Sequence, residues 1–136
     1  MPNGAVLLDD GNVAILAQGT KTKKGGIAIF NPKSIGSGSG SVDDDNDDNV
    51  KYLTTSWGAL ETPFNSLNDI VQASDGSIWF TDPQYGYEQG FRPPPESGNW
   101  VWRYDYKTNK TRLMADQFIR PNGIAFSLNE DCVYYR

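Results

Sequence analysis

Residues 68–81 read NDIVQASDGSIWFT, and versions of this stretch occur at two other places in the chain. Residues 3–16 read NGAVLLDDGNVAIL and align with it without a gap, at an offset of 65 residues. Residues 122–135 read NGIAFSLNEDCVYY and align after one inserted residue. Each copy has an Asn, a short apolar run, a turn rich in Asp, Asn or Gly, and a second apolar run. This pattern predicts three β-hairpins that each open on an Asn.

A second part of the unit is repeated as well. Residues 27–33 align with residues 101–107 at an offset of 74, and each segment is followed by a turn and another apolar run. Four short strands in a unit of roughly fifty to sixty residues are typical of β-propeller blades. We therefore expect an all-β partial propeller of about two and a half blades: residues 3–54, residues 68–114, and the first two strands of a third blade in residues 122–136.

Composition restricts the classes of function. The 136 residues are 38% hydrophobic and 21% charged, which excludes collagen and a fully disordered chain. No run of about 18 apolar residues occurs, so no membrane span is expected. The net charge of −5 argues against a nucleic-acid partner. Without His, serine-triad chemistry and Cys-His zinc sites are excluded, and the lone Cys132 is expected to be a small hydrophobic residue in a strand.

Two stretches depart from the regular pattern. Residues 36–49 combine Gly and Ser with a run of Asp, which predicts a solvated, disordered hairpin extension. A calcium loop counted from Asp43 fails, because Asp48 would occupy its Gly position and Thr54 its Glu position. Residues 85–95 form a long connection between two strands. That connection is either a rigid surface loop or a wall or lid over the central opening of the propeller.

The Asn residues that open the repeated hairpins are the candidate site. The first strand of each propeller blade lines the central channel, so Asn68 and Asn122 should be neighbours although 54 residues separate them. An amide oxygen is a hard, neutral ligand suited to calcium or a similar cation. The alternative is that each Asn only caps the turn into its strand. The residue pattern leaves both interpretations open.

Several motifs closely resemble the senescence-marker/gluconolactonase-like family. They are residues 64–71, residues 74–83, Tyr85-Gly86 and residues 120–127, and residues 90–95 are most similar to the fungal lactonohydrolase branch of that family. The resemblance covers nearly the whole chain apart from the acidic stretch. It implies a propeller of six blades, a divalent cation, usually calcium, at the mouth of the channel, and hydrolysis of sugar or aldonate lactones.

The resemblance also implies roles for two residues. Asn122 matches a metal ligand, and Asn68 matches an Asn that lies at both the metal and the substrate. The acidic metal ligand of the first blade would precede Met1, and the Asp that serves as ligand and general base would follow Arg136. The chain is therefore expected to lack part of the active site.

Two functions from different classes remain. Neither Glu61 nor Asp131 matches an acidic motif of the family, so no catalytic residue is assigned. In the first, the chain is a fragment of a calcium-dependent lactonohydrolase that acts on a small lactone. Alone, the fragment is expected to be inactive and to hold calcium weakly or not at all. The alternative is a non-catalytic interaction or self-assembling module that associates through open blade edges. Localisation stays open, with the cytoplasm expected if Met1 is the true start.

Overall fold

The structure is a computed structural model that describes residues 1–34 and 50–136. The predicted acidic extension at residues 36–49 lies outside the described residues. The described part of the chain is built almost wholly from antiparallel strands, as the repeat predicts. No helix in that part is long and apolar enough to cross a membrane.

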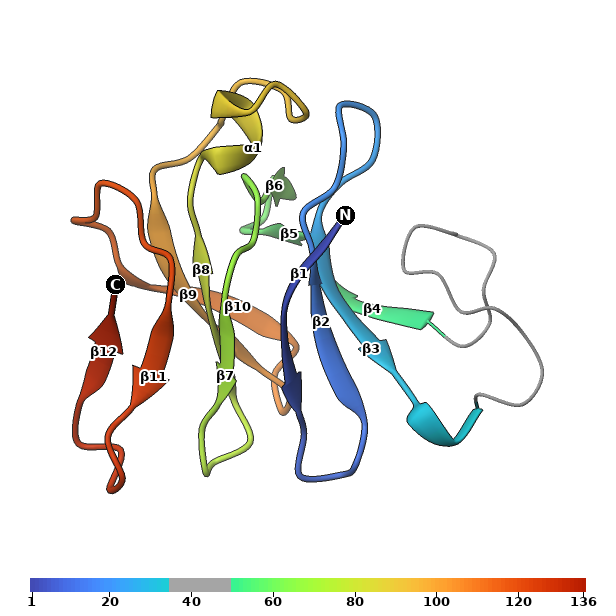
Figure 1. Ribbon diagram of the computed structural model, residues 1–136, viewed down its shortest axis with the longest axis vertical. Coiled ribbons are helices and arrows are strands. Elements are labelled where there is room, and N and C mark those ends of the chain that lie inside the picture. Colours follow the sequence, from blue (N-terminus) through green and yellow to red (C-terminus); the bar gives the residue numbers. More distant parts are fainter. Residues whose placement is uncertain (35–49) are drawn as a thin grey trace.

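The first sheet contains four antiparallel strands in the order β1-β2-β3-β4 (Figure 1). The second strand has one buried face, because Ala14 and Leu16 are fully buried while Ile15 between them is only partly covered. The strands are β1 (Pro2–Leu7), β2 (Val13–Ala17), β3 (Gly26–Phe30) and β4 (Val50–Thr54), and the short 3-10 helix η1 (Pro32–Ser34) follows β3.

The second sheet repeats this architecture, with the order β10-β9-β8-β7. A third, two-stranded sheet pairs β11 with β12, and a small additional hairpin pairs β5 with β6 between the two large sheets in sequence. The strands are β5 (Ser56–Trp57), β6 (Thr62–Pro63), β7 (Ile70–Gln72), β8 (Ile78–Asp82), β9 (Trp100–Asp105), β10 (Lys110–Ala115), β11 (Ile124–Phe126) and β12 (Val133–Tyr135).

The hydrophobic core joins the two large sheets. Leu16 of the first sheet belongs to the same buried cluster as Phe80 and Trp102 of the second. Phe64, from the segment that links the sheets, meets Phe80 edge to face at 5.4 Å and Trp102 at 5.9 Å between ring centroids. The linking segment is therefore part of the core and fixes the packing of one sheet against the other.

The first strands of the three sheets lie side by side. Figure 1 shows β7 between β1 and β11, and both neighbours contact it. The backbone N–H of Gly4 donates to the Asn68 carbonyl at 2.9 Å, and that of Ile124 donates to Asp69 Oδ2 at 2.9 Å. The three Asn-containing strand starts predicted from the repeat thus converge at one end of the sheets.

The turn of the third hairpin has a different residue at positive φ from the turns of the first two hairpins. The turns of the first two hairpins place Gly11 and Gly76 at φ of 82° and 84°, a conformation that glycine adopts readily. The third turn places Glu130 at φ 57° instead. Its carboxylate accepts hydrogen bonds from the backbone N–H of Ser74 at 2.8 Å and the Ser74 hydroxyl at 2.7 Å. The unusual turn residue therefore ties the third hairpin to the second.

Three features of the fold were not predicted. The β5-β6 hairpin was missed because its strands are two residues long, and residues 85–95 begin with a one-turn helix, α1 (Tyr85–Glu88). The expectation for Cys132 was wrong. The inserted residue delays the last strand until Val133, so Cys132 lies in the preceding turn and is exposed.

Candidate functional site

A polar cavity of about 330 Å³ lies where the first strands of the sheets begin. Asn68 and Asn122 both line it, so the structure brings together the two predicted site residues. Asn3, their counterpart in the first repeat, lines it as well. The remaining lining residues are Pro2, Gln18, Tyr85 and Gln89.

Thr81, a buried residue at the end of β8, fixes the backbone of the predicted site residues. The Asn68 N–H donates to the Thr81 carbonyl at 2.9 Å, and the Thr81 hydroxyl donates to the Asn122 carbonyl at 2.7 Å. The same hydroxyl accepts the N–H of Asp69 at 3.0 Å. The two Asn residues are therefore held in position by their main chains, which leaves their side chains available.

Gly4 permits the close approach of the first strand to Asn68. A Cβ at position 4 would lie 2.6 Å from the Asn68 carbonyl oxygen, whereas a Cβ at position 123, the equivalent Gly of the third repeat, would have 3.6 Å to its nearest neighbour. We expect Gly4→Ala to lower the free energy of unfolding by about 1–3 kcal/mol. Gly123→Ala should change it by no more than about 0.5 kcal/mol. Equal losses for the two variants in urea denaturation would contradict this account of the strand contact.

The polar side chains of the cavity form no hydrogen bonds to other described residues. This holds for all six polar residues that line it. Most other side-chain amides in the described residues are hydrogen-bonded, the exposed Gln117 and Asn129 being exceptions. Asn65 Nδ2, for example, donates to the carbonyls of Asp82 at 3.3 Å and Gly98 at 2.9 Å. Further bonded amides are Asn12, Gln72, Gln84, Asn99 and Asn109. This contrast favours ligand binding over a purely structural role for Asn68 and Asn122.

The segment that begins with α1 forms one wall of the cavity through Tyr85 and Gln89. Arg92, only 6% exposed, anchors this segment. Its guanidinium donates to the carbonyls of Asn65 and Phe64 at 2.7 Å each, of Thr20 at 2.8 Å and of Lys23 at 2.7 Å. Of the two interpretations of residues 85–95, these bonds favour a fixed wall.

Asp82 lies beneath the same wall and is completely buried. Its carboxylate accepts the backbone N–H of Asn65 at 3.0 Å and of Ser66 at 2.9 Å. Burial raises the pKa of Asp82 from 3.8 to about 7, although the two backbone donors and the nearby Arg92 charge oppose the shift. Asp82 is enclosed by the protein and does not line the cavity. Its bonds fix the backbone at Asn65 and Ser66, and the Ser66 hydroxyl in turn accepts the Gly86 N–H of the wall at 2.9 Å.

The residues of the cavity do not by themselves form a calcium site. Their amide and phenol oxygens are neutral, and no Asp or Glu of the described chain lines the cavity. The carboxylate of Asp69, next to Asn68, already accepts the Ile124 N–H. Within the described ranges, no three His, Cys, Asp or Glu side chains gather where they could hold a metal ion. Calcium sites normally combine about six to eight oxygens that include carboxylates, so the donor set is incomplete.

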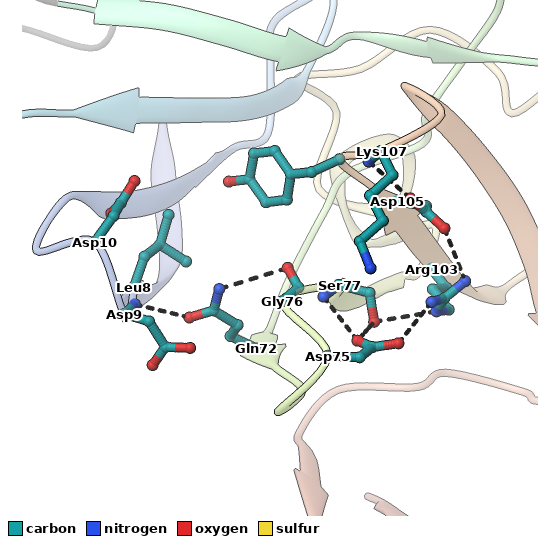
Figure 2. Close-up of a pocket in the computed structure, with 11 residues that line it drawn as sticks. Leu8, Asp9, Asp10, Gln72, Asp75, Gly76, Ser77, Arg103, Asp105 and Lys107 are labelled. Atoms are coloured by element: carbon teal, nitrogen blue, oxygen red, sulfur yellow. Dashed lines mark hydrogen bonds and ion pairs between the residues drawn. The ribbon is translucent and has the colours of Figure 1, made fainter.

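A second cavity, of about 280 Å³, lies at the opposite end of β7 and differs in chemistry. Figure 2 shows that its polar groups bond to one another. Arg103 pairs with Asp75 at 2.8 Å and with Asp105 at 3.5 Å, and it donates to the Ser77 hydroxyl at 3.0 Å. These bonds join turns and strands of the second sheet, so this cavity is a weaker candidate for ligand binding than the cavity lined by Asn68 and Asn122.

Sequence reasoning identified two of the six polar side chains in the first cavity. Asn3 carried a signal, because it aligns with Asn68 and Asn122 in the repeat. Gln18, Tyr85 and Gln89 lie in connections outside the repeated strands, so no periodic signal marked them. Glu61 and Asp131, which match no acidic motif of the family, do not line the cavity.

Known proteins resemble both the sequence and the fold. The lactonohydrolase oryL of Aspergillus oryzae is 33% identical over 72 residues, which are 52% of this chain and 16% of that protein. A solved gluconolactonase from Xanthomonas campestris, described as important in glucose secondary metabolic pathways, is 28% identical with a TM-score of 0.74. A second solved structure, assigned as a gluconolactonase, is 24% identical with a TM-score of 0.74 and supports the fold alone.

The chain is much shorter than the two solved structures that it matches. The matches cover 98% of this chain but only 39% and 40% of the two structures, so the chain spans about two fifths of their length and forms part of a propeller. The match to a family extends over residues 1–136, the whole sequence. Together with the all-β fold, that match shows that the chain belongs to the SMP-30/gluconolactonase/LRE-like family.

Proposed function

We propose that this chain supplies part of the active site of a lactone hydrolase that acts on sugar or aldonate lactones. One observation carries the proposal: Asn68 and Asn122 line the same cavity of a gluconolactonase-family chain, and their side chains have no hydrogen bonds to other described residues. The similarity to a lactonohydrolase and a gluconolactonase supports the choice of substrate.

The chemistry of the cavity suits binding and orientation of a lactone. Amide N–H groups of Asn68 and Asn122 can donate to the ester oxygens, and amide oxygens can accept from ring hydroxyls. Hydrolysis also needs a base that takes a proton from water, and no carboxylate in the described residues lines the cavity. We infer that this chain is a fragment of the functional enzyme and that catalysis requires further blades.

A chimera tests this function. This chain would replace the segment that it matches in the Xanthomonas campestris gluconolactonase, and release of gluconate from D-glucono-δ-lactone would be measured above the spontaneous rate. We expect the isolated chain to be inactive and the chimera to be active. Asn122→Ala in the chimera should lower the rate about 100-fold or more, whereas Asn129→Ala, at an exposed turn residue outside the cavity, should not. Full activity of the Asn122→Ala chimera would remove the basis of the proposal.

Calcium enters the proposal only for a site completed by carboxylates beyond those described. Because Asn68 and Asn122 bring no charge, the isolated chain should show no saturable heat of calcium binding up to about 1 mM in isothermal titration calorimetry. The same calcium should leave its melting temperature unchanged. Tighter binding that Asn122→Ala abolishes would show that the neutral amides suffice.

Self-association is the second candidate function, and exposed apolar side chains favour it. Leu60 is 92% exposed, Ile119 is 87% exposed and Leu128 is fully exposed. The strands at the sheet edges could also pair with a second copy. Sedimentation equilibrium distinguishes the candidates, since an assembly module forms a defined oligomer, whereas a hydrolase fragment stays monomeric or aggregates without a fixed size.

A further inference from the structure

We propose that Tyr85 and Gln89 determine the specificity of the cavity by binding the hydroxyl groups of a polyhydroxylated lactone. The inference rests on the proposed lactone hydrolysis and extends it. Tyr85 in α1 and Gln89 directly after it then discriminate a sugar lactone from an alkyl lactone. Asn68 and Asn122 then serve the ester group that both kinds of lactone share.

The lining of the cavity selects this class of ligand. Five residues with side-chain amides and one with a phenol line it, together with Pro2, and no charged residue of the described chain does. A surface with so little apolar area gives an alkyl chain little hydrophobic gain. A hydroxyl group donates one hydrogen bond and accepts others, and amides offer both kinds of partner. The cavity therefore matches an uncharged, hydroxylated ring.

Tyr85 and Gln89 are preorganised for this role. The Gln89 N–H donates to the Tyr85 carbonyl at 2.8 Å, and the Gly86 N–H between them donates to the buried Ser66 hydroxyl at 2.9 Å. Gly86 itself is buried, and a Cβ there would overlap Arg92. A fixed backbone reduces the conformational entropy that is lost when a ligand binds.

Neighbouring side chains on the same segment are already bonded. Gln84 Nε2 donates to the Ser97 carbonyl at 3.1 Å, and Glu88 pairs with Arg120 at 3.1 Å. The Tyr85 hydroxyl and the Gln89 amide have no such bond to a described residue, and both residues line the cavity. The segment thus uses some polar side chains for structure and leaves these two for a ligand.

The inference is tested by titrating the 136-residue chain with two lactones and following its side-chain amide signals by nuclear magnetic resonance. The probes are D-glucono-δ-lactone and δ-valerolactone, which has the same ester ring without hydroxyls. The gluconolactone should shift the side-chain amide signals of Asn68, Asn122 and Gln89, and the valerolactone only those of the two Asn residues. Tyr85→Phe and Gln89→Ala should each weaken gluconolactone binding about three- to tenfold and leave valerolactone binding unchanged.

Tyr87→Phe is the matched control, because Tyr87 lies on the same helix but is 49% exposed and does not line the cavity. It should change neither affinity. If Gln89→Ala proves unfolded in its amide spectrum, Gln89→Glu, which keeps the size and removes the donor, replaces it with the same expected loss.

The outcomes separate the two proposals. Shifts at Asn68 and Asn122 with both lactones, together with no effect of the Tyr85 and Gln89 variants, would overturn the specificity assignment and leave the proposed function standing. Equal weakening of both lactones by Gln89→Ala would also overturn it, because discrimination would be unaltered. No shift at Asn68 or Asn122 with either lactone would overturn the specificity assignment, because the cavity of this chain would bind no lactone, whereas the activity of the chimera decides the proposed function separately.

Discussion

Arg92→Met should lower the free energy of unfolding by at least about 3 kcal/mol. The guanidinium serves four backbone carbonyls in two separate segments, around Thr20 and Lys23 and at Phe64 and Asn65. Met fills a similar volume but donates nothing, so buried carbonyls would lose their partners. Urea denaturation followed by tryptophan fluorescence measures the loss.

Arg112→Met is the matched control for this substitution. Arg112 is exposed on β10 and lies outside the hydrophobic core, so its replacement should change the free energy of unfolding by no more than about 0.5 kcal/mol. Arg92→Lys should fall between the two variants, because a single ammonium group cannot reach all four carbonyls. Equal stability of the Arg92→Met and Arg112→Met chains would show that the four bonds add nothing.

Asp82→Asn should remove a large pH dependence of stability. Burial raises the pKa of Asp82 to about 7 from 3.8, so the folded chain holds this proton more tightly than the unfolded chain. The resulting stabilisation is complete below about pH 4 and is lost as the pH rises to about 7. The Asp82→Asn variant has no titrating group at this position. Relative to that variant, the wild-type chain should lose on the order of 3 kcal/mol between about pH 4.5 and pH 7.5.

The measurement is urea denaturation of both chains at about pH 4.5, 6 and 7.5, which bracket the change. The informative quantity is the free energy of unfolding of the wild type minus that of Asp82→Asn, since other titrating groups cancel in it. Asp75→Asn is the control, because hydrogen bonds from Ser77 lower the pKa of Asp75 to about 2, below the range tested. A difference that stays constant or rises with pH would mean that folded Asp82 is already charged at the lowest pH.

The repeated stretch predicted much of the fold because hairpin periodicity is a local property. Apolar alternation and Asp-Gly turns placed the strands of the repeated hairpins, and the repeat placed Asn68 and Asn122 at equivalent strand starts. Their convergence followed from the geometry of a propeller, in which first strands share one axis. The structure agrees on both points, since β1, β7 and β11 are adjacent and the two Asn residues line one cavity.

The rest of the site could not be predicted from the sequence, because it depends on contacts between distant connections. Gln18 and Gln89 reach the cavity from loops that have no counterpart in the repeat. Arg92 looks like a surface residue beside three prolines, yet its partners at Thr20 and Lys23 lie about seventy residues away in sequence. Neither hydropathy nor spacing reports such a bond, so the buried clamp appears only in three dimensions.

The position after each strand-opening Asn alternates along the three units as Gly4, Asp69 and Gly123, and this limits how such a protein can grow by duplication. Asp69 lies against Gly4 on one side and bonds the neighbouring Ile124 N–H on the other. Two adjacent copies of the second unit would bring a carboxylate where the structure now has a glycine, adding both bulk and like charge. The first and second units are therefore not interchangeable at this position, because only a glycine fits against Asn68 and Asp69 there.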